Sequence, residues 1–238
     1  GPEFRSCASP SGGDWEGGLA PIRAMITLYD YELSGNCYKL RLMMSILRLR
    51  YEVVAVDYYP GNDTQSDWFL KLNPLGELPV LVDDGRVFTE ATLAWLARKY
   101  DASGRWLPVD DPALVAEVMT WTSFAARLSE ASGGARLAIA FEHDIDLSRA
   151  QAEAHRLFRV MDEHLWFGEK EGRDWLASAD HPTIADIACF PHTALSEEGG
   201  ISRQDYPAIR RWLDRVRRIE GFAVMSGVFP ASRAREVS

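Results

Sequence analysis

The chain has few cysteines and histidines, and they show no spacing typical of a metal site. There are 238 residues with 3 cysteines and 5 histidines, and neither a CxxC nor an HExxH pattern occurs. No metal ion is therefore expected. The cysteines are too few and too scattered for a disulfide framework, and their odd number favours a reducing compartment. We therefore expect a cytoplasmic protein with the free cysteines Cys7, Cys37 and Cys189.

Excess positive charge and long apolar runs are also missing. With 26 Lys and Arg against 35 Asp and Glu, the formal net charge is −9. This charge argues against binding to nucleic acid or to an anionic membrane surface, because both present phosphate groups. No apolar run approaches the roughly 18 residues that a membrane span needs. An apolar fraction of 47% is ordinary for a soluble globular protein, and the length allows one large or two small domains.

Residues 1–24 are rich in Gly, Pro and Ser and show no periodicity. The opening tetrapeptide, Gly-Pro-Glu-Phe, is typical of a protease-cleavage and cloning sequence. No basic segment precedes an apolar one, so the stretch does not have the pattern of a signal peptide. We predict a tag or disordered leader here and exclude it from the fold prediction.

Strand and helix patterns alternate over residues 25–101. Apolar and β-branched runs predict strands, a one-face apolar spacing predicts helices, and Asp84-Gly85 is a hairpin turn signal. The predicted elements are a strand at 26–29, a helix at 38–49, a strand at 51–56, a polar loop at 60–67, a hairpin at 78–88 and a helix at 89–100. The order βαβ followed by ββα predicts an α+β domain.

Strand patterns disappear after residue 101. A linker rich in Pro, Gly and Asp leads to Asp111, which can cap a helix that has Pro112 at its first position. Thr183 and Asp186 form a capping box before another helix. Further helical spacing is present at 115–122, 157–165 and 206–219. An all-helical second domain over 110–230 is the prediction.

The turn after the first strand brings a hydroxyl and a thiol, Ser34 and Cys37, to a predicted helix N-terminus. The free N–H groups and the helix dipole stabilise an anion there. The same environment lowers the pKa of a thiol. The turn therefore suits a thiolate, which belongs either to the protein or to a ligand. Both residues also have structural interpretations, because serine often caps helices and free cysteine is often buried.

Three motifs occur in order: LYxxxxSGNCYK at the first turn, NPLGELPVL before the hairpin and PTIADIACFP in the helical half. Together they resemble the cytosolic glutathione transferases, especially bacterial members with a serine at the active turn. The resemblance implies a thioredoxin-like N-terminal domain, an all-helical C-terminal domain and a homodimer. It also implies glutathione as co-substrate, no further cofactor, and a small hydrophobic electrophile as the second substrate.

The resemblance assigns the catalytic hydroxyl to Ser34, which would donate a hydrogen bond to the glutathione sulfur and favour its thiolate. Asn36 would either orient the sulfur or satisfy the turn. Cys37 is the alternative catalytic group, because related classes use a cysteine at this turn to form mixed disulfides or to break thioethers.

Glutathione is expected along two further segments. In this fold the bond before Pro79 is cis, and the main chain of Leu78 would pair with the cysteinyl part of the ligand. Glu90 stands where the family has an acid, whereas Ala91 replaces the expected serine, so that Thr89 or Thr92 would supply the hydroxyl.

Two charged residues bear on the glycyl carboxylate of glutathione. Glu77 stands where many relatives have Lys or Gln, and an acid there would repel the carboxylate. A cation can compensate for it, and the candidates are Lys39, Lys71 and Arg41. Lys39 is included in the predicted glutathione site.

The acceptor pocket is expected at Leu33, Trp121 and Phe124, although aromatic residues at helical spacing also suit a core. The expected activity is conjugation of glutathione to electrophiles, or reduction of peroxides. One alternative is a Cys37-dependent glutathione lyase or thiol-disulfide enzyme. Another is a non-catalytic member that binds ligands or partners.

Overall fold

The computed structural model describes residues 26–225, and the leader predicted at residues 1–24 lies outside this range. Four strands form one mixed sheet with the order β2-β1-β3-β4. Strand β1 is parallel to β2 and antiparallel to β3, and β3 is antiparallel to β4. The strands are β1 (Ile26–Asp30), β2 (Tyr51–Ala55), β3 (Val80–Asp83) and β4 (Arg86–Phe88).

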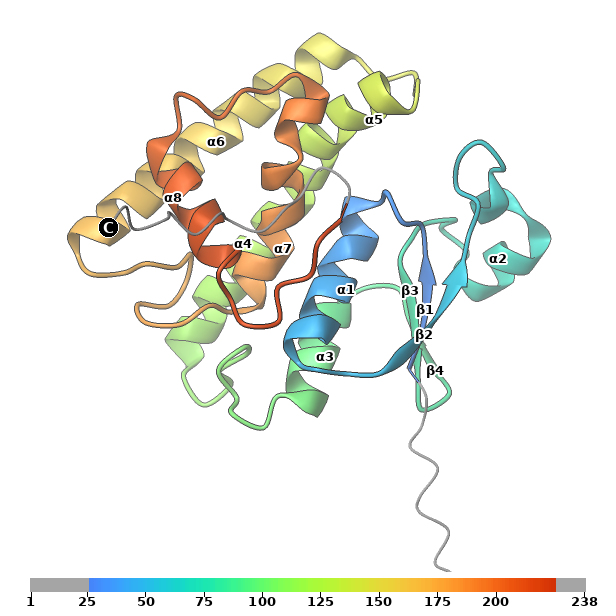
Figure 1. The fold of residues 1–238 in the computed structure, drawn as a ribbon, viewed down its shortest axis with the longest axis horizontal. Helices are drawn as coiled ribbons and strands as arrows, with labels where there is room; N and C mark the ends of the chain where they lie inside the picture. Colours follow the sequence, from blue (N-terminus) through green and yellow to red (C-terminus); the bar gives the residue numbers. More distant parts are fainter. Residues whose placement is uncertain (1–25, 226–238) are drawn as a thin grey trace, which may run out of the picture.

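Helices cover both faces of this sheet. Figure 1 shows α1 (Gly35–Ile46) and α3 (Thr92–Tyr100) on the face toward the C-terminal helices, and α2 (Asp67–Leu72) on the opposite side. The apolar residues of α1, such as Leu40 and Met43, are almost completely buried. The predicted thioredoxin-like arrangement is confirmed.

The structure differs from the prediction at three places in this domain. The short helix α2 and the 3-10 turn η1 (Asp63–Gln65) were not predicted, because α2 buries one residue, Phe69, and shows no period. Helix α1 begins three residues earlier than expected, at Gly35. Helix α3 begins at Thr92, not at residue 89, because Ala91 has a φ of 53° and interrupts the helical backbone.

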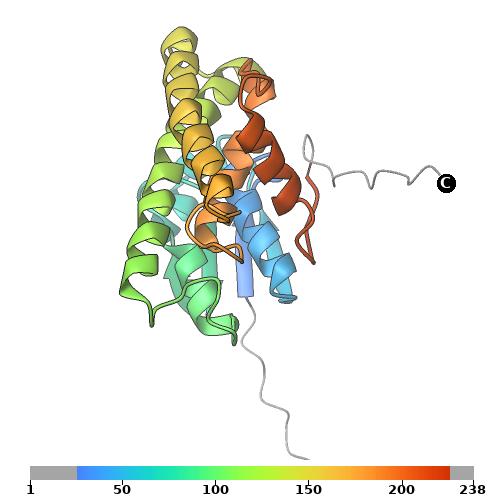
Figure 2. The same ribbon diagram turned by 90° about the vertical axis from the view of Figure 1, so that its left-hand side faces the viewer.

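The second domain is all-helical, as predicted. Its elements are α4 (Pro112–Leu128), the π-helical η2 (Ser129–Gly133), α5 (Gly134–Ala140), α6 (Leu147–Lys170), α7 (Ile184–Ala194), η3 (Ser196–Gly199) and α8 (Pro207–Val216). Figure 2 shows α4 and α6 running lengthwise through this domain. The predicted caps are confirmed: the carboxylate of Asp111 accepts hydrogen bonds from two N–H groups of α4, and Thr183 and Asp186 form the capping box of α7.

Helix α7 joins the two domains. All of its residues are buried, and it packs against α1 and α3 of the sheet domain and against α4 and α8 of its own domain. One continuous apolar core therefore extends through both domains. None of the helices in the described range is long and apolar enough to span a membrane.

Candidate active site between the two domains

A cavity of about 1000 Å³ lies between the domains. The sheet domain contributes the turn after β1, the loop after β2, the segment before β3 and the beginning of α3. The helical domain contributes α4, η2, α5 and α7. Ligand pockets commonly range from roughly 300 to 1,000 Å³, so this cavity has room for two small ligands side by side.

Ser34 is the N-cap of α1 and lines the cavity. Its Oγ accepts a hydrogen bond from the Cys37 N–H at 3.2 Å, which leaves the hydroxyl proton available to an acceptor in the cavity. Gly35 follows, and a Cβ there would lie 3.0 Å from Cε1 of His192. Glycine therefore allows the turn after β1 to approach the helical domain closely.

Cys37 is turned away from the cavity. It is fully buried, it does not line the cavity, and its Sγ accepts the Tyr31 N–H at 3.5 Å. Burial, with a contribution from the nearby Asp30 carboxylate, raises the pKa of Cys37 to about 12. The expectation that the helix N-terminus lowers the pKa of this thiol is therefore wrong, because the cost of desolvating a thiolate exceeds the effect of the hydrogen bonds.

Asn36 lines the cavity and links three helices. Its Nδ2 donates to the Ser129 Oγ at 3.2 Å, and its Oδ1 lies 3.0 Å from Nε2 of His192. An amide oxygen can only accept, so Nε2 of His192 carries the proton. Burial, together with the positive charges of Lys39 and Arg136, lowers the pKa of His192 to about 3. His192 is therefore neutral and fixes the Asn36 carboxamide across the domain boundary.

Leu78 and Pro79 line the cavity, and the peptide bond between them is cis, as predicted. Within residues 26–225, neither the N–H nor the C=O of Leu78 has a hydrogen-bond partner. Both main-chain groups are therefore available to a peptide ligand in the cavity.

The beginning of α3 also opens into the cavity. Glu90, Ala91 and Thr92 all line it, and no side chain caps this helix. The N–H groups of residues 92–94 make no hydrogen bond to other described residues, as is usual for the first turn of a helix. Thr89 and Thr92 both line the cavity, but Thr92 is the residue at the helix start.

Lys39 points into the same region from α1. It lines the cavity, and burial lowers its pKa, while the nearby Glu90 carboxylate opposes this shift. Two cations, Lys39 and Arg136, and two helix N-termini meet in the cavity, while its three glutamates, Glu77, Glu90 and Glu130, are exposed to solvent. This arrangement favours an anionic ligand. The described residues include no cluster of His, Cys, Asp or Glu that could hold a metal ion.

Of the three residues predicted for the acceptor pocket, only Leu33 lines the cavity. Trp121 is 6% exposed and packs 4.4 Å from the ring of His164 and 4.9 Å from that of Phe124. Neither Trp121 nor Phe124 lines the cavity, because their face of α4 packs toward the core around α6. Smaller residues of α4 line it instead, among them Met119, Thr122, Ala125 and Ala126.

Several cavity residues were not predicted from the sequence. They are Arg136, His192, Ser129 and an aromatic group formed by Tyr31, Tyr58, Tyr59, Phe141 and His143. One sequence signal was available, the Ser132-Gly133-Gly134 run inside a helical pattern, because such glycines often mark a close approach. A Cβ on Gly133 would lie 2.8 Å from Nδ1 of His192.

The fold and the cavity define a two-domain thioredoxin-like protein with a cavity of ligand size between the domains. Residues 28–104 match the family described as Glutathione S-transferase, N-terminal domain, and residues 144–215 match Glutathione S-transferase, C-terminal domain. A glutathione S-transferase structure from Pseudomonas fluorescens Pf-5 is 31% identical with a TM-score of 0.75, covering 84% of this chain and 98% of that one. The chain belongs to the glutathione S-transferase family.

Two curated relatives extend this comparison. Glutathione S-transferase verG of Clonostachys rogersoniana is 26% identical over 201 residues, which are 79% of this chain and 81% of the relative. Disulfide-bond oxidoreductase YfcG of Escherichia coli K12 is 27% identical over 212 residues, which are 81% of this chain and 90% of the relative. The relatives support an enzyme of the glutathione transferase type.

Proposed function

We propose that the chain binds glutathione in the interdomain cavity, stabilises its thiolate at Ser34 and conjugates it to small hydrophobic electrophiles. The observation that carries this proposal is the Ser34 hydroxyl, which caps α1 from the cavity side with its proton available. A hydrogen bond from this hydroxyl favours the charged sulfur. The sulfur then forms a bond to carbon, and the electron pair of the breaking bond departs with the leaving group.

The remaining groups of the cavity suit the rest of glutathione. The free N–H and C=O of Leu78 would pair with the cysteinyl residue as an added strand does. The γ-glutamyl carboxylate would lie on the free N–H groups at the start of α3, near Thr92 and Lys39, and Glu90 would hold the γ-glutamyl amine. Glu77, which also lines the cavity, is exposed at its rim, so solvent screens its charge.

A second candidate function is glutathione-dependent reduction of disulfides, which the similarity to a disulfide-bond oxidoreductase of Escherichia coli favours. The buried thiol of Cys37 argues against a mechanism in which Cys37 attacks. In this version the glutathione thiolate at Ser34 attacks the disulfide and forms a mixed disulfide, and a second glutathione thiolate then releases the other thiol. The reduction of peroxides by glutathione would use the same thiolate.

The proposal also includes a homodimer, which sedimentation at micromolar concentration would test.

The test combines glutathione titration with steady-state kinetics on a chloronitrobenzene and on a small disulfide. We expect Ser34→Ala to lower kcat/KM about tenfold to a hundredfold, because one hydrogen bond to a charged group contributes roughly 1.5–3 kcal/mol. The apparent pKa of bound glutathione should rise, while its affinity should change less. Cys37→Ser is the matched control at the same turn and should keep its activity on both substrates.

Three outcomes would contradict the proposal. Full conjugation activity in Ser34→Ala would show that the hydroxyl does not stabilise the thiolate. Activity that survives Ser34→Ala but is abolished in Cys37→Ser would assign the chemistry to Cys37. An absence of glutathione binding to the wild type would favour the non-catalytic alternative.

A further inference from the structure

Arg136 on α5 places a buried cation at the cavity wall. The residue is 7% exposed, its Nε donates to Glu198 at 2.6 Å, and its Nη1 donates to the carbonyl oxygen of Leu33 at 2.7 Å. The other N–H groups of the guanidinium have no hydrogen-bond partner within residues 26–225. A buried guanidinium with free donors favours an anionic oxygen as its ligand.

The carboxylates near Arg136 do not cancel its preference for an anionic ligand. Glu198 binds only the Nε of Arg136, and its own side chain is 36% exposed. Glu130 also lines the cavity, but it is exposed, so its charge is screened by solvent. Asp57 accepts the Gly61 N–H and stays within its own loop.

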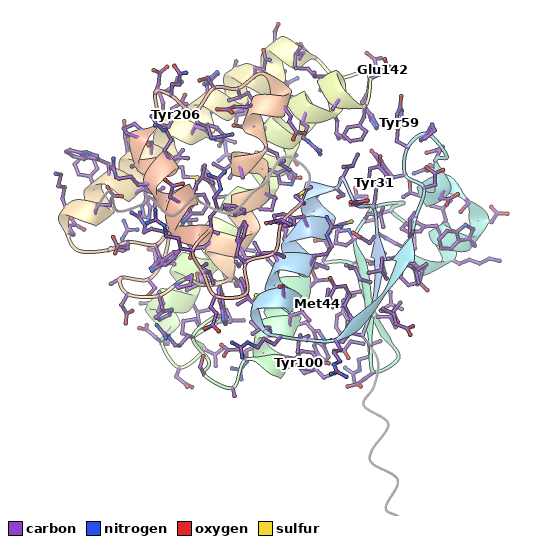
Figure 3. All side chains as sticks on the ribbon, in the orientation of Figure 1. Tyr31, Met44, Tyr59, Tyr100, Glu142 and Tyr206 are labelled. Atoms are coloured by element: carbon purple, nitrogen blue, oxygen red, sulfur yellow. The ribbon has the colours of Figure 1, made fainter. Side chains whose placement is uncertain are left out.

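An aromatic wall stands beside Arg136. It is formed by Tyr31, Tyr58, Tyr59, Phe141 and His143, all of which line the cavity. Ring centroids lie 5.5 Å apart for Tyr31 and Tyr58 and 5.8 Å apart for Tyr59 and Phe141. Figure 3 shows Tyr31 and Tyr59, from the sheet domain, near Glu142, which follows α5 in the helical domain. A planar aromatic ring is the ligand that such a wall packs against most favourably.

The wall and the cation lie close together. The Arg136 guanidinium is 5.2 Å from the centre of the Phe141 ring. Through its bond to the Leu33 carbonyl, the same guanidinium is fixed beside the residue that precedes Ser34. A substrate carbon that reacts at Ser34 therefore lies near both the wall and the cation.

From this geometry we infer that the electrophile is an aromatic acid, whose ring packs on the aromatic wall and whose carboxylate binds Arg136. This inference rests on the proposed function and specifies its second substrate. The bond changes are those of the conjugation described above. Arg136 selects the substrate, and the sulfur attacks a carbon on the ring or on a side chain attached to it.

The test uses binding of S-substituted glutathiones, which resemble the products and require no turnover. The probes are S-benzylglutathione and its 3-carboxy and 4-carboxy derivatives, titrated calorimetrically into the full chain. We expect at least one carboxylated probe to bind about ten times more tightly than S-benzylglutathione, because charge-assisted hydrogen bonds are among the strongest in proteins. Equal or weaker binding of both carboxylated probes to the wild type would overturn the inference.

Variants assign the preference to the guanidinium. Arg136→Gln should remove the preference for the carboxylated probe, and Arg136→Lys should retain part of it because the charge remains. Arg127→Gln is the matched control, since Arg127 also pairs with a glutamate on a helix but lies outside the cavity. If Arg136→Gln does not fold, Arg136→Lys and the wild type decide the question. A preference unchanged in a folded Arg136 variant would contradict the assignment.

The outcomes separate this inference from the function on which it depends. If S-benzylglutathione binds but the carboxylated probes bind no more tightly, the proposed function stands, and the inference that the electrophile is an aromatic acid is wrong. If none of the probes binds, the proposed function fails and this inference fails with it. Oxidised glutathione is titrated in the same way; if Arg136→Gln weakens its binding and leaves binding of the carboxylated probes unchanged, the guanidinium serves a second glutathione, which also overturns the aromatic acid.

Discussion

Helices α1 and α7 both begin with a hydroxyl residue that caps the helix, but the two helix N-termini have different surroundings. At α7, Thr183 accepts the Ala185 N–H, and the Asp186 carboxylate accepts the N–H groups of Thr183 and Leu176 and the Trp212 Nε1–H. This entire group is buried. At α1, Ser34 accepts a single N–H, and its hydroxyl faces the cavity.

The difference shows when a helix N-terminus can act as a binding site. The N-terminus of α7 has its own carboxylate, so its donors are occupied and it serves the fold. The N-terminus of α3 has no side-chain cap, and its first three N–H groups open into the cavity. The N-terminus of α1 lies between these two cases. Helix termini bind ligands where their donors remain free and a cavity reaches them.

The largest expected effect concerns the N-terminus of α7, where the capping residues serve the fold. Asp186→Ala removes an acceptor that serves three buried N–H donors, and each unsatisfied donor costs about 1–3 kcal/mol. We expect the free energy of unfolding to fall by at least about 3 kcal/mol in urea denaturation. Asp180→Ala, whose side chain is 81% exposed, is the control and should change little. A comparable loss in both variants would show that the capping network is not the cause.

The next effect tests His192, which connects α7 to the turn of α1. Its pKa is about 3 in the folded protein and about 6.5 when unfolded, so between these pH values the unfolded chain binds a proton that the folded chain does not. Stability is therefore lost as the pH falls through this window, by about 2 kcal/mol from pH 7 to pH 5.

Denaturation of His192→Gln at both pH values checks this expectation. The loss of stability between pH 7 and pH 5 should be about 2 kcal/mol smaller in the variant than in the wild type. His164, whose pKa is also lowered by burial, is present in both proteins, so the difference isolates His192. An identical pH dependence would mean that the pKa of His192 is the same in the folded and unfolded protein.

A smaller effect concerns the N-terminus of α3, which has no side-chain cap. Thr92→Val keeps the shape of the side chain and removes its hydroxyl. We expect glutathione affinity to fall on the order of tenfold, since a hydrogen bond to a charged group is lost. Thr120→Val is the control, because the Thr120 hydroxyl donates to Ala116 within α4. Unchanged affinity in Thr92→Val would exclude this hydroxyl from the γ-glutamyl site.

The smallest effect tests the buried side of the α1 turn. Cys37→Ala should keep conjugation within about twofold, because the thiol faces the core and its pKa is about 12. In the folded wild type, iodoacetamide should leave Cys37 unmodified at pH 7, as measured by mass spectrometry of digested protein. Rapid modification of Cys37 would place a reactive thiolate at this turn and remove the contrast with Ser34.

Patterns of local origin were predictable from the sequence. The strands of the sheet, the Asp111 cap and the capping box of α7 follow from short runs of residues. The beginning of α3 was not predictable in this way, because Thr89 and Glu90 are ordinary residues for a helix start. The positive φ of Ala91 becomes visible only in the folded chain.

The two-domain order, the capped helix starts and the presence of Ser34 in a turn can be read from the chain alone, since these features depend on neighbouring residues. Which side chains meet in the cavity depends on how the two domains pack together. The direction of Cys37 and Trp121 into the core, and the approach of Arg136 and His192 to the α1 turn, depend on contacts between residues far apart in the chain. No spacing in the sequence records those contacts, because they arise when α7 and α5 pack against the sheet domain.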